Sequence, residues 1–264
     1  MVKFSVLMVT YNGEDEKRLD KSLSSIENQI LRPTETIICL DGKLRQELLN
    51  VINKYMQKIN IKIIKNKKSS LAENLNIGLI NCKYEYVVRC DSDDISLPNR
   101  FHEQINLLNN SVFDVVSANS IEILNTKKRI KRIPYGLIKK NSAYRYFRNP
   151  VNHNVCAFKK ESILRFKYPI SRMEDFLLWT MVLNSDLKIY NQDKELLIAD
   201  VNDLDSRRIG YYYRKAELKL FLMNFNESNY FGKLYSFLAL LIRYPLRFKY
   251  FKFFLNVIYK CIRS

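Results

Sequence analysis

The sequence predicts an α/β fold, in which a Rossmann-like, mostly parallel sheet with flanking helices is followed by basic, aromatic helices. Three observations predict it. Apolar strand-like runs and helix-periodic segments alternate four times within the first ninety residues, which is typical of βαβ units with right-handed crossovers. Acidic residues gather at the end of the fourth run, where an open parallel sheet binds ligands. Beyond Arg207 the composition becomes aromatic and basic.

The first half of the chain contains four apolar runs that are nearly continuous, as in strands covered on both faces. The expected strands are Phe4–Thr10, Thr36–Leu40, Ile61–Ile64 and Tyr86–Cys90. Segments with helical spacing separate them. The expected helices are one containing Leu19, Leu23 and Ile26, then Leu48–Tyr55 and Ser70–Ile80.

The second half of the chain has a less regular pattern. We expect helices at Asn99–Leu108 and Glu174–Leu183, and strands at Asp114–Asn119, Asn154–Phe158 and Leu196–Val201. The basic stretch Lys127–Arg132 is expected to be a solvated hairpin or loop.

The charge of the chain predicts a polyanionic partner. Among 264 residues there are 44 Lys and Arg against 27 Asp and Glu, a net charge of +17. From Arg207 onward twelve Lys and Arg face two Glu, so most of the surplus lies at the C-terminal end. Nucleic acid, an acidic membrane face and a phosphorylated substrate all fit such a charge.

The five cysteines favour a reduced, cytosolic protein. Their number is odd, no Cys-x-x-Cys pair occurs, and most stand in apolar strand or helix contexts. The first residues read as a strand rather than a signal peptide, since no small-residue cleavage site follows the short apolar run. No stretch reaches the ~18 apolar residues of a membrane span.

The stretch 84–94 carries the strongest functional signal. A buried strand delivers Asp91, Asp93 and Asp94 at its C-terminal end, and Pro98 ends the loop before a helix. Carboxylates two residues apart can bracket a hard divalent cation that shares substrate phosphates. The alternative is an acidic, solvated turn. The six glycines form neither GxGxxG nor a phosphate-binding GxxxxGK[ST] loop, so a metal rather than a backbone nest is expected to bind diphosphate.

Together these segments resemble family 2 glycosyltransferases with the GT-A fold, over about residues 3–215. Four motifs occur in the family's order: Ser5–Glu14, Cys39–Gly42, Ala72–Gly78 before Asp91-Ser92-Asp93-Asp94, and Met173–Trp179. Arg207-Arg208-x-Gly210 and the basic tail look most like bacterial O-antigen and capsule enzymes, which act on sugars linked to undecaprenyl diphosphate. The resemblance divides the chain into a nucleotide-binding half (1–98), an acceptor half (99–205) and a membrane-associating extension (206–264).

The resemblance implies a site for a UDP-sugar at the end of the first two strands. Thr10, Tyr11 and Asn12 would hold the base, with Tyr11 stacked on uracil; plain packing is the alternative for Tyr11. Glu14 would reach the base or ribose, or otherwise serve as a helix N-terminal charge. Asp41 would accept a hydrogen bond from the uracil N3–H. The residue before it, Leu40, departs from the family's Asp-Asp pair.

Further donor contacts are implied around the acidic cluster. Asn76 would lie near the nucleotide, although helix-surface asparagine is common. Asp91, with Ser92, would contact the ribose, while Asp93 would bind Mn²⁺ or Mg²⁺ through the diphosphate, with Asp91 as a second ligand. Asp94 is expected to fix the loop, since three carboxylates exceed what a substrate-sharing site usually uses.

The Glu174-Asp175 pair is the second acidic site. Glycosyl transfer passes through an oxocarbenium-like state, and the attacking hydroxyl must lose a proton to a base. A diphosphate held by metal needs no general acid, so one base and one metal describe an inverting enzyme. Asp175 fits the base and Glu174 the acceptor-orienting neighbour. The alternative is a charged helix N-terminus.

Two more residues are candidate acceptor contacts. Trp179 lies one helical turn beyond Asp175 and could platform an acceptor sugar, or else be buried against the sheet. His153 precedes an expected strand beside the site and could bind metal or acceptor phosphate. The alternative for His153 is a hydrogen-bonded structural role.

The C-terminal extension suits helices in the interface of an anionic membrane. Residues 211–264 hold sixteen of the chain's thirty-two Phe and Tyr, interleaved with Lys and Arg, and no acid follows Glu227. A helical lid packed on the core and a nucleic-acid face are the alternatives. No nucleic-acid motif accompanies the stretch, so no nucleic acid is expected as a partner.

The expected function is that of a metal-dependent, inverting glycosyltransferase. It would transfer a hexose, Glc or Gal, from a UDP-sugar to an undecaprenyl-diphosphate-linked glycan, by resemblance with a β-1,3 linkage. The expected location is peripheral, at the cytoplasmic face of the inner membrane. A nucleotidyltransferase is the enzymatic alternative, although the chain lacks its glycine-rich loop. A non-enzymatic basic adaptor would leave Asp93 and Asp175 unexplained.

Overall fold

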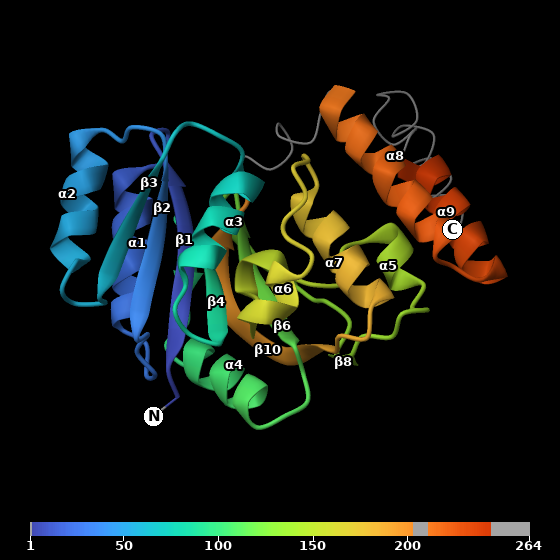
Figure 1. Cartoon of the computed structure of the whole chain (residues 1–264), viewed down its shortest axis with the longest axis horizontal. Helices are drawn as coiled ribbons and strands as arrows, with labels where there is room; N and C mark the ends of the chain where they lie inside the picture. Colours follow the sequence, from blue (N-terminus) through green and yellow to red (C-terminus); the bar gives the residue numbers. More distant parts are fainter. Residues whose placement is uncertain (1, 203–210, 244–264) are drawn as a thin grey trace.

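The computed structural model describes residues 2–202 and 211–243. One sheet dominates it, with strand order β3-β2-β1-β4-β9-β6-β10-β5, while β7 pairs with β6 and β8 with β10 (Figure 1). Strands β3, β2, β1 and β4 are parallel, β6 and β10 are parallel, and β9 runs antiparallel between β4 and β6. The expected fold class, a mostly parallel sheet with flanking helices, is confirmed.

The strands of the nucleotide-binding half end within a residue or two of their expected positions. They are β1 (Phe4–Tyr11), β2 (Glu35–Asp41), β3 (Ile61–Asn66) and β4 (Tyr86–Asp91). The helices between them are α1 (Glu16–Glu27), α2 (Gln46–Tyr55) and α3 (Leu71–Asn81). Side chains fix where two of these helices begin: Asp15 accepts from the Lys17 and Arg18 amides, and Ser70 forms a reciprocal capping box with Glu73.

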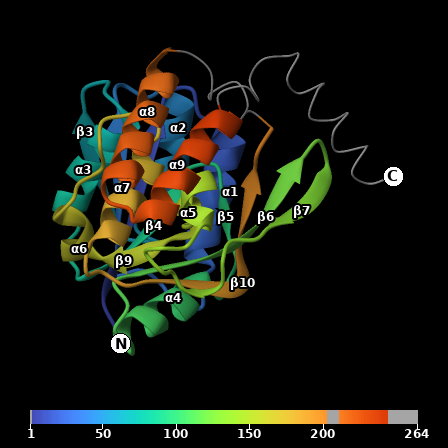
Figure 2. The same cartoon turned by 90° about the vertical axis from the view of Figure 1, so that its right-hand side faces the viewer.

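The acceptor half is built from shorter elements. They are β5 (Ile95–Ser96), α4 (Arg100–Asn109), β6 (Val115–Leu124), β7 (Lys127–Lys131), β8 (Gly136–Leu137), α5 (Tyr144–Phe147), the 3₁₀ turn η1 (His153–Val155), β9 (Ala157–Lys159), α6 (Lys160–Leu164), α7 (Glu174–Asn184) and β10 (Ile189–Asp200). The expected basic hairpin is the exposed β6–β7 ribbon, which projects from the body in Figure 2.

One expected strand, Asn154–Phe158, is wrong in its first half. Residues 153–155 form η1 because polar side chains hold this segment in a turn. The Asn152 amide donates to Ser120 Oγ (2.9 Å), and the Asn154 amide donates to Asp94 Oδ2 (2.8 Å). The strand begins only at Ala157. The expected strand Leu196–Val201 is the second half of the longer β10.

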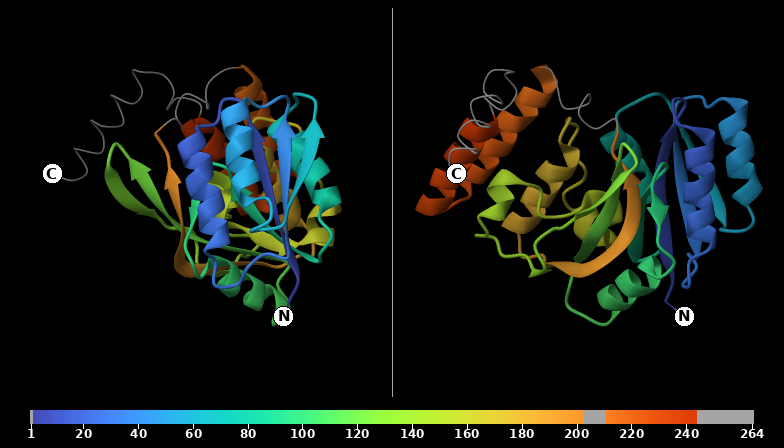
Figure 3. Two further views of the ribbon diagram at one scale, coloured as in Figure 1. Left: turned by 90° about the vertical axis from the view of Figure 1, so that its left-hand side faces the viewer. Right: turned by 180° about the vertical axis from the view of Figure 1, so that it is seen from behind.

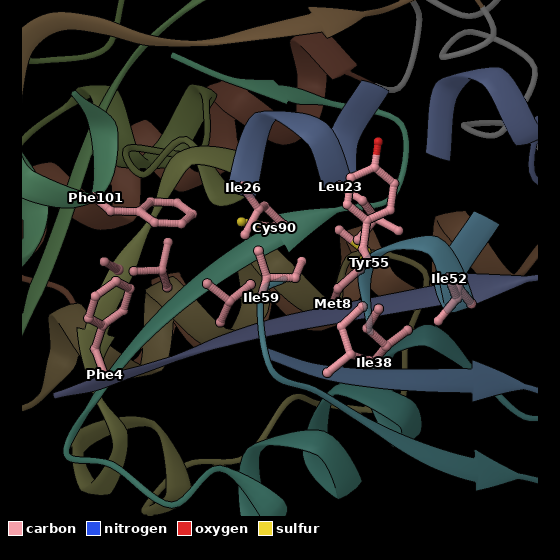
Figure 4. Close-up of a cluster of buried hydrophobic side chains, with 14 of the residues drawn as sticks. Phe4, Met8, Leu23, Ile26, Ile38, Ile52, Tyr55, Ile59, Cys90 and Phe101 are labelled. Atoms are coloured by element: carbon pink, nitrogen blue, oxygen red, sulfur yellow. The ribbon is translucent and has the colours of Figure 1, made fainter. Parts of the chain in front are cut away.

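Helices cover both faces of the sheet and bury two apolar clusters. On one face α1, α2 and α4 pack on alternate residues of β1, β2 and β4, including Phe4, Met8 and Ile38 (Figures 3 and 4). On the other face α3, α6 and α7 pack on the intervening residues, such as Leu7 and Ile37. This alternation along each strand is what places two layers of helices on one parallel sheet.

Two helices of the C-terminal extension form an outer layer. Helix α8 (Tyr211–Asn226) packs on α7, and α9 (Tyr230–Arg243) packs on α8 and α5 (Figures 1 and 3). Within residues 2–202 and 211–243 no helix combines the length and apolarity needed to cross a bilayer. The Arg207-Arg208-x-Gly210 element, Cys261 and the extension beyond Arg243 lie outside the described residues.

The described cysteines match the expectation of reduced thiols. Cys39, Cys82, Cys90 and Cys156 are free and buried.

Candidate active site

Parallel pairing brings the ends of β1, β2 and β4 to one edge of the sheet. In register, Tyr11 lies opposite Asp41, and Val9 lies opposite Asp91. The sequence-predicted donor residues on these three strands therefore share one edge. In parallel sheets this carboxyl edge is where ligands bind.

Tyr11 offers an open aromatic face at this edge. Its side chain is 47% exposed, and its ring lies over Gly13, where an added Cβ would come within 2.6 Å of Tyr11 Cε2. A larger residue at position 13 would therefore displace the Tyr11 ring from its place over the turn. The neighbouring Thr10 is fully buried, so its side chain is closed to a ligand.

The turn after β1 is tied to the loop that follows β2. Asn12 Oδ1 accepts from the Arg45 amide (2.7 Å), and the Arg45 guanidinium donates to the Glu14 carbonyl (2.8 Å) and pairs with Glu16. Asp41 Oδ1 accepts from the Ser69 amide (2.7 Å). These hydrogen bonds fix the shape of the edge where the donor is expected to bind. Arg45 takes part in them, and sequence reasoning missed it.

Glu14 and Ser92 contact each other directly. Both side chains are buried, and the Ser92 hydroxyl donates to Glu14 Oε2 in a short hydrogen bond. Glu14 Oε1 accepts from the Asp15 amide (3.0 Å). The two residues expected to bind the donor thus form a joint between the β1 turn and the acidic loop.

The acidic loop brings three carboxylates together. One oxygen from each of Asp91, Asp93 and Asp94 lies within 4.8 Å of the others. Burial, with the charges of Asp91 and Glu14, raises the pKa of Asp93 to about 6. Burial, with Asp91 and Asp93, raises the pKa of Asp94 well above its usual range. Crowded carboxylates of this kind fit a hard divalent cation, which would relieve their repulsion.

Asp94 also has the structural role that was expected of it. It is nearly buried, and Oδ2 accepts from the Asn154 amide (2.8 Å). This bond holds the acidic loop against η1 on the acceptor half.

Arg89 is a buried counter-charge that sequence reasoning missed. It lies two residues before Asp91 on the same face of β4, and its guanidinium pairs with both Asp91 oxygens. Burial disfavours its charge, yet the surrounding negative charges, led by Asp91, raise the pKa of Arg89. A charged residue inside an otherwise apolar strand is the signal that could have revealed it. The pair orients the Asp91 carboxylate.

The second acidic pair begins α7. Asp175 Oδ2 accepts from the Asn149 amide (3.0 Å), another contact that the sequence did not indicate. Burial, together with the charge of Asp175, raises the pKa of Glu174 to about 7. A carboxyl group with a pKa near neutrality is suited to proton transfer, and Glu174 stands next to the expected base.

Trp179 does not platform an acceptor, so that prediction is wrong. Its side chain is fully buried in the cluster beneath α7, as the alternative of burial against the sheet had it. His153 packs between Tyr168 and Trp179, with ring centroids 5.6 Å from each. Burial, together with Arg89 and Lys131, lowers the pKa of His153 well below its usual range. An uncharged, enclosed ring favours a structural role for His153, but its hydrogen bonding is weaker than expected. Its Nδ1 lies 3.9 Å from Cys156 Sγ, and its Nε2 has no hydrogen-bond partner among the described residues.

The Asn76 amide is used inside the protein rather than presented to a ligand. Its Nδ2 donates to the Tyr168 carbonyl (2.9 Å), and its Oδ1 accepts from the Tyr168 amide (2.7 Å). The expected donor contact is therefore replaced by a two-bond clamp between α3 and the segment leading to Glu174.

The fold and the two acidic sites define the class of protein, a GT-A glycosyltransferase. Residues 5–166 match the model of glycosyl transferase family 2, and the chain belongs to that family. The chain is 32% identical, over 86% of its length and 85% of the relative's, to the Escherichia coli UDP-Gal:alpha-D-GlcNAc-diphosphoundecaprenol beta-1,3-galactosyltransferase. It is 29% identical, over 83% and 84%, to the amylovoran biosynthesis glycosyltransferase AmsE of Erwinia amylovora.

Solved structures share the fold. Staphylococcus aureus TarS 1-349 in complex with UDP-GlcNAc superposes with a TM-score of 0.68 at 20% identity, covering 85% of this chain and 67% of TarS. The mannosyltransferase PcManGT from Pyrobaculum calidifontis, in complex with GDP-Man and Mn²⁺, gives 0.60 at 14% identity, covering 99% and 81%.

Proposed function

We propose that this protein transfers a hexose from a UDP-sugar to a sugar on a lipid diphosphate, with inversion at the anomeric carbon. The observation that carries the proposal is the carboxylate cluster of Asp91, Asp93 and Asp94 at the edge where Tyr11 and Asp41 also lie. A nucleoside diphosphate is bound well by an aromatic ring on which its base can stack, with a cation site for its phosphates nearby. The galactosyltransferase relative, named for UDP-Gal and a lipid-linked GlcNAc, supports the donor and acceptor classes.

On the donor side, Tyr11 stacks on uracil, and Asp41 accepts from its N3–H. The Glu14–Ser92 joint holds the ribose side of the pocket with Asp91. Asp93 and Asp91 would bind Mn²⁺ or Mg²⁺. When bound, that cation neutralises the charge that develops on the leaving diphosphate.

On the acceptor side, Asp175 takes the proton from the acceptor hydroxyl. The freed oxygen forms a bond to the anomeric carbon as the bond to the donor phosphate breaks, and UDP leaves with the electron pair. Glu174 orients the acceptor. A single displacement inverts the configuration, so an α-linked UDP-Gal or UDP-Glc gives a β product. The galactosyltransferase relative supports Gal and a β-1,3 linkage as the first case to test.

The proposed location is the cytoplasmic face of the inner membrane, because a lipid-linked acceptor is held there. Residues 1–205 would form the catalytic domain and 206–264 its membrane-associating extension. Packing of α8 on α7 makes the first part of this extension continuous with the acceptor half.

UDP release is the direct test. Purified protein is given UDP-Gal, UDP-Glc, UDP-GlcNAc and GDP-Man, each with a GlcNAc-diphosphate lipid acceptor, with Mn²⁺ or with EDTA. We expect release from a UDP-hexose that requires both acceptor and metal. Asp93→Asn should abolish it, while Asp186→Asn, a change of an exposed carboxylate paired with Arg165, should not. Turnover in EDTA, or with GDP-Man alone, would contradict the proposal.

A further inference from the structure

Helix α9 turns its small residues toward the protein and its large apolar residues toward solvent. Gly232, Ser236 and Ala239 are buried. The exposed residues on the other side are Phe231, Leu234, Phe237 and Leu238. A helix that covers a core shows the opposite arrangement, with its apolar stripe inward. The apolar side of α9 therefore faces away from the protein.

Packing fixes this orientation. An added Cβ on Gly232 would collide with the Tyr146 hydroxyl and Ser228, and the Ser236 hydroxyl donates to the Gly232 carbonyl (2.8 Å). The Tyr235 ring contacts the Tyr146 ring at 6.0 Å between centroids. Turning α9 to bury Phe231 or Phe237 would drive large side chains into this narrow contact. The packing between α9 and its neighbours therefore keeps the apolar side of α9 exposed.

Helix α8 also presents apolar residues to solvent. It buries Ala216, Glu217 and Leu220 and exposes Leu218 and Leu222. Lysines stand among the exposed positions of both helices. We define the outer face as Lys215, Leu218, Lys219 and Leu222 of α8 with Phe231, Lys233, Leu234, Phe237 and Leu238 of α9. Burial of Glu217 keeps its carboxylate off this face.

We propose that the outer face docks on an anionic lipid bilayer. Apolar and aromatic side chains interleaved with lysine are what the interface of an acidic leaflet binds. Charge complementarity also favours an anionic bilayer over other occupants of the outer face. Residues 244–264 add five Lys and Arg and no acid, and the whole chain carries +17, so neither this segment nor a second copy supplies complementary charge. An anionic leaflet does.

The outer face lies one helix layer from the acceptor carboxylates. Ala216 and Leu220 of α8 pack on Met173 and Phe176, and Met173 directly precedes Glu174. A bilayer on this face would hold the diphosphate of a lipid-linked sugar about one helix layer from α7. The biological sense of the docking thus rests on the proposed function, whereas the docking itself is measurable without catalysis.

Vesicle co-sedimentation of the full chain tests the proposal. The vesicles contain equal parts phosphatidylglycerol and phosphatidylcholine, with pure phosphatidylcholine as comparison, and no sugar nucleotide is present. Two variants change the outer face, Leu234→Gln/Phe237→Gln and Lys215→Glu/Lys219→Glu. Their matched controls change exposed residues elsewhere, Ile30→Gln/Val112→Gln and Lys62→Glu/Lys65→Glu.

We expect the wild type to bind the anionic vesicles and to lose binding on pure phosphatidylcholine and in 1 M salt. The Leu234→Gln/Phe237→Gln variant should bind the anionic vesicles about tenfold more weakly. The Lys215→Glu/Lys219→Glu variant should lose at least about fivefold in vesicle affinity for each lysine replaced. Controls should stay within about twofold of the wild type. Melting temperatures should be unchanged, because the altered side chains are exposed. UDP release on a water-soluble acceptor should survive in both outer-face variants, which separates this proposal from the proposed function.

Three results would overturn the proposal. The first is a wild type that does not sediment with anionic vesicles. The second is a pair of outer-face variants that bind as well as their controls. The third is ultracentrifugation showing a wild-type dimer that the Leu234→Gln/Phe237→Gln change dissociates, which would make the outer face an interface between copies.

Discussion

Replacing Asn76 by Ala tests whether its side chain holds the Tyr168 backbone or binds the sugar-nucleotide donor. In the structure the Asn76 amide holds both backbone groups of Tyr168, at 2.9 and 2.7 Å. The Tyr168 ring packs on His153, and His153 packs on Trp179, one turn after Asp175. Loss of the clamp should therefore loosen the segment that positions Glu174 and Asp175, while the donor edge stays intact.

The expected magnitude follows from two hydrogen bonds. Each contributes about 1 kcal/mol net, so the clamp contributes about 2 kcal/mol. Since about 1.4 kcal/mol corresponds to a factor of ten, the clamped population and kcat should fall by up to about 30-fold. Asn76→Asp keeps the acceptor for the Tyr168 amide but loses the donor, so its loss should be intermediate.

Steady-state kinetics, donor titration and melting curves are the assay. For Asn76→Ala we expect a lower kcat with the Kd of the UDP-sugar changed by less than about twofold. Asn81→Ala is the control on the same helix, because its amide donates to the Ile77 carbonyl within α3. A donor Kd that rises while kcat holds would refute the clamp and restore Asn76 as a donor ligand. A lower melting temperature with unchanged kcat would show that the Asn76–Tyr168 hydrogen bonds stabilise the fold without positioning Asp175.

Four further changes test other parts of the structure. Asp93→Asn should weaken Mn²⁺-dependent donor binding by more than about 100-fold, measured by titrating Mn²⁺ at fixed UDP-sugar; an unchanged titration would leave the acidic loop as a mere turn. Asp175→Asn should lower kcat by about 10²–10⁴ without changing donor affinity, and equal losses of both would indicate a structural cap. The wild-type rate should fall as the pH drops through about 7, where Glu174 takes up a proton, and Glu174→Gln should remove this acidic limb because the titrating carboxyl group is gone. A limb that stays in place would assign it to another group. Gly78→Ala should lower the unfolding midpoint, since the added methyl meets Leu7 and comes within 2.8 Å of Cys39 Sγ, an overpacking cost of about 1–3 kcal/mol; an unchanged or higher midpoint would show that α3 can shift.

The strands were predictable because their cause is local. An apolar, β-branched run such as Phe4–Tyr11 reports its own burial, and its end was predicted to within one residue. The segment Asn154–Phe158 failed because its conformation depends on partners distant in sequence. Asn154 bonds Asp94, sixty residues away, and no local pattern records that.

The candidate site likewise contains some residues whose roles the local sequence predicted and others whose roles it did not. The spacing of Asp91 and Asp93 after a strand was enough to predict a carboxylate cluster, because the end of a parallel strand has a known edge of the sheet. Trp179 was misassigned because most of α7 is apolar around its circumference, so spacing alone does not say which side meets the sheet. Asn76 was misassigned because an amide on a helix surface suits a ligand and a backbone clamp equally well.

Arg89 shows how the two acidic sites depend on each other. Five carboxylates, those of Glu14, Asp91, Asp93, Asp94 and Glu174, are gathered around this end of the sheet, and like charges at such range oppose one another's ionisation. Burial raises the pKa of Asp93, Asp94 and Glu174, and the buried Arg89 cation opposes that rise at all three. A strand-buried arginine would be unfavourable without this role, because its guanidinium must be desolvated. Its position on β4, beneath the acidic loop and within range of α7, therefore couples the charge state of the metal cluster to that of the acceptor pair. A cation added at the cluster should in turn favour an ionised Glu174, so the acidic limb of the rate should lie at lower pH when Mn²⁺ is saturating than when it is limiting. A limb that ignores the Mn²⁺ concentration would show that the two sites are electrostatically independent.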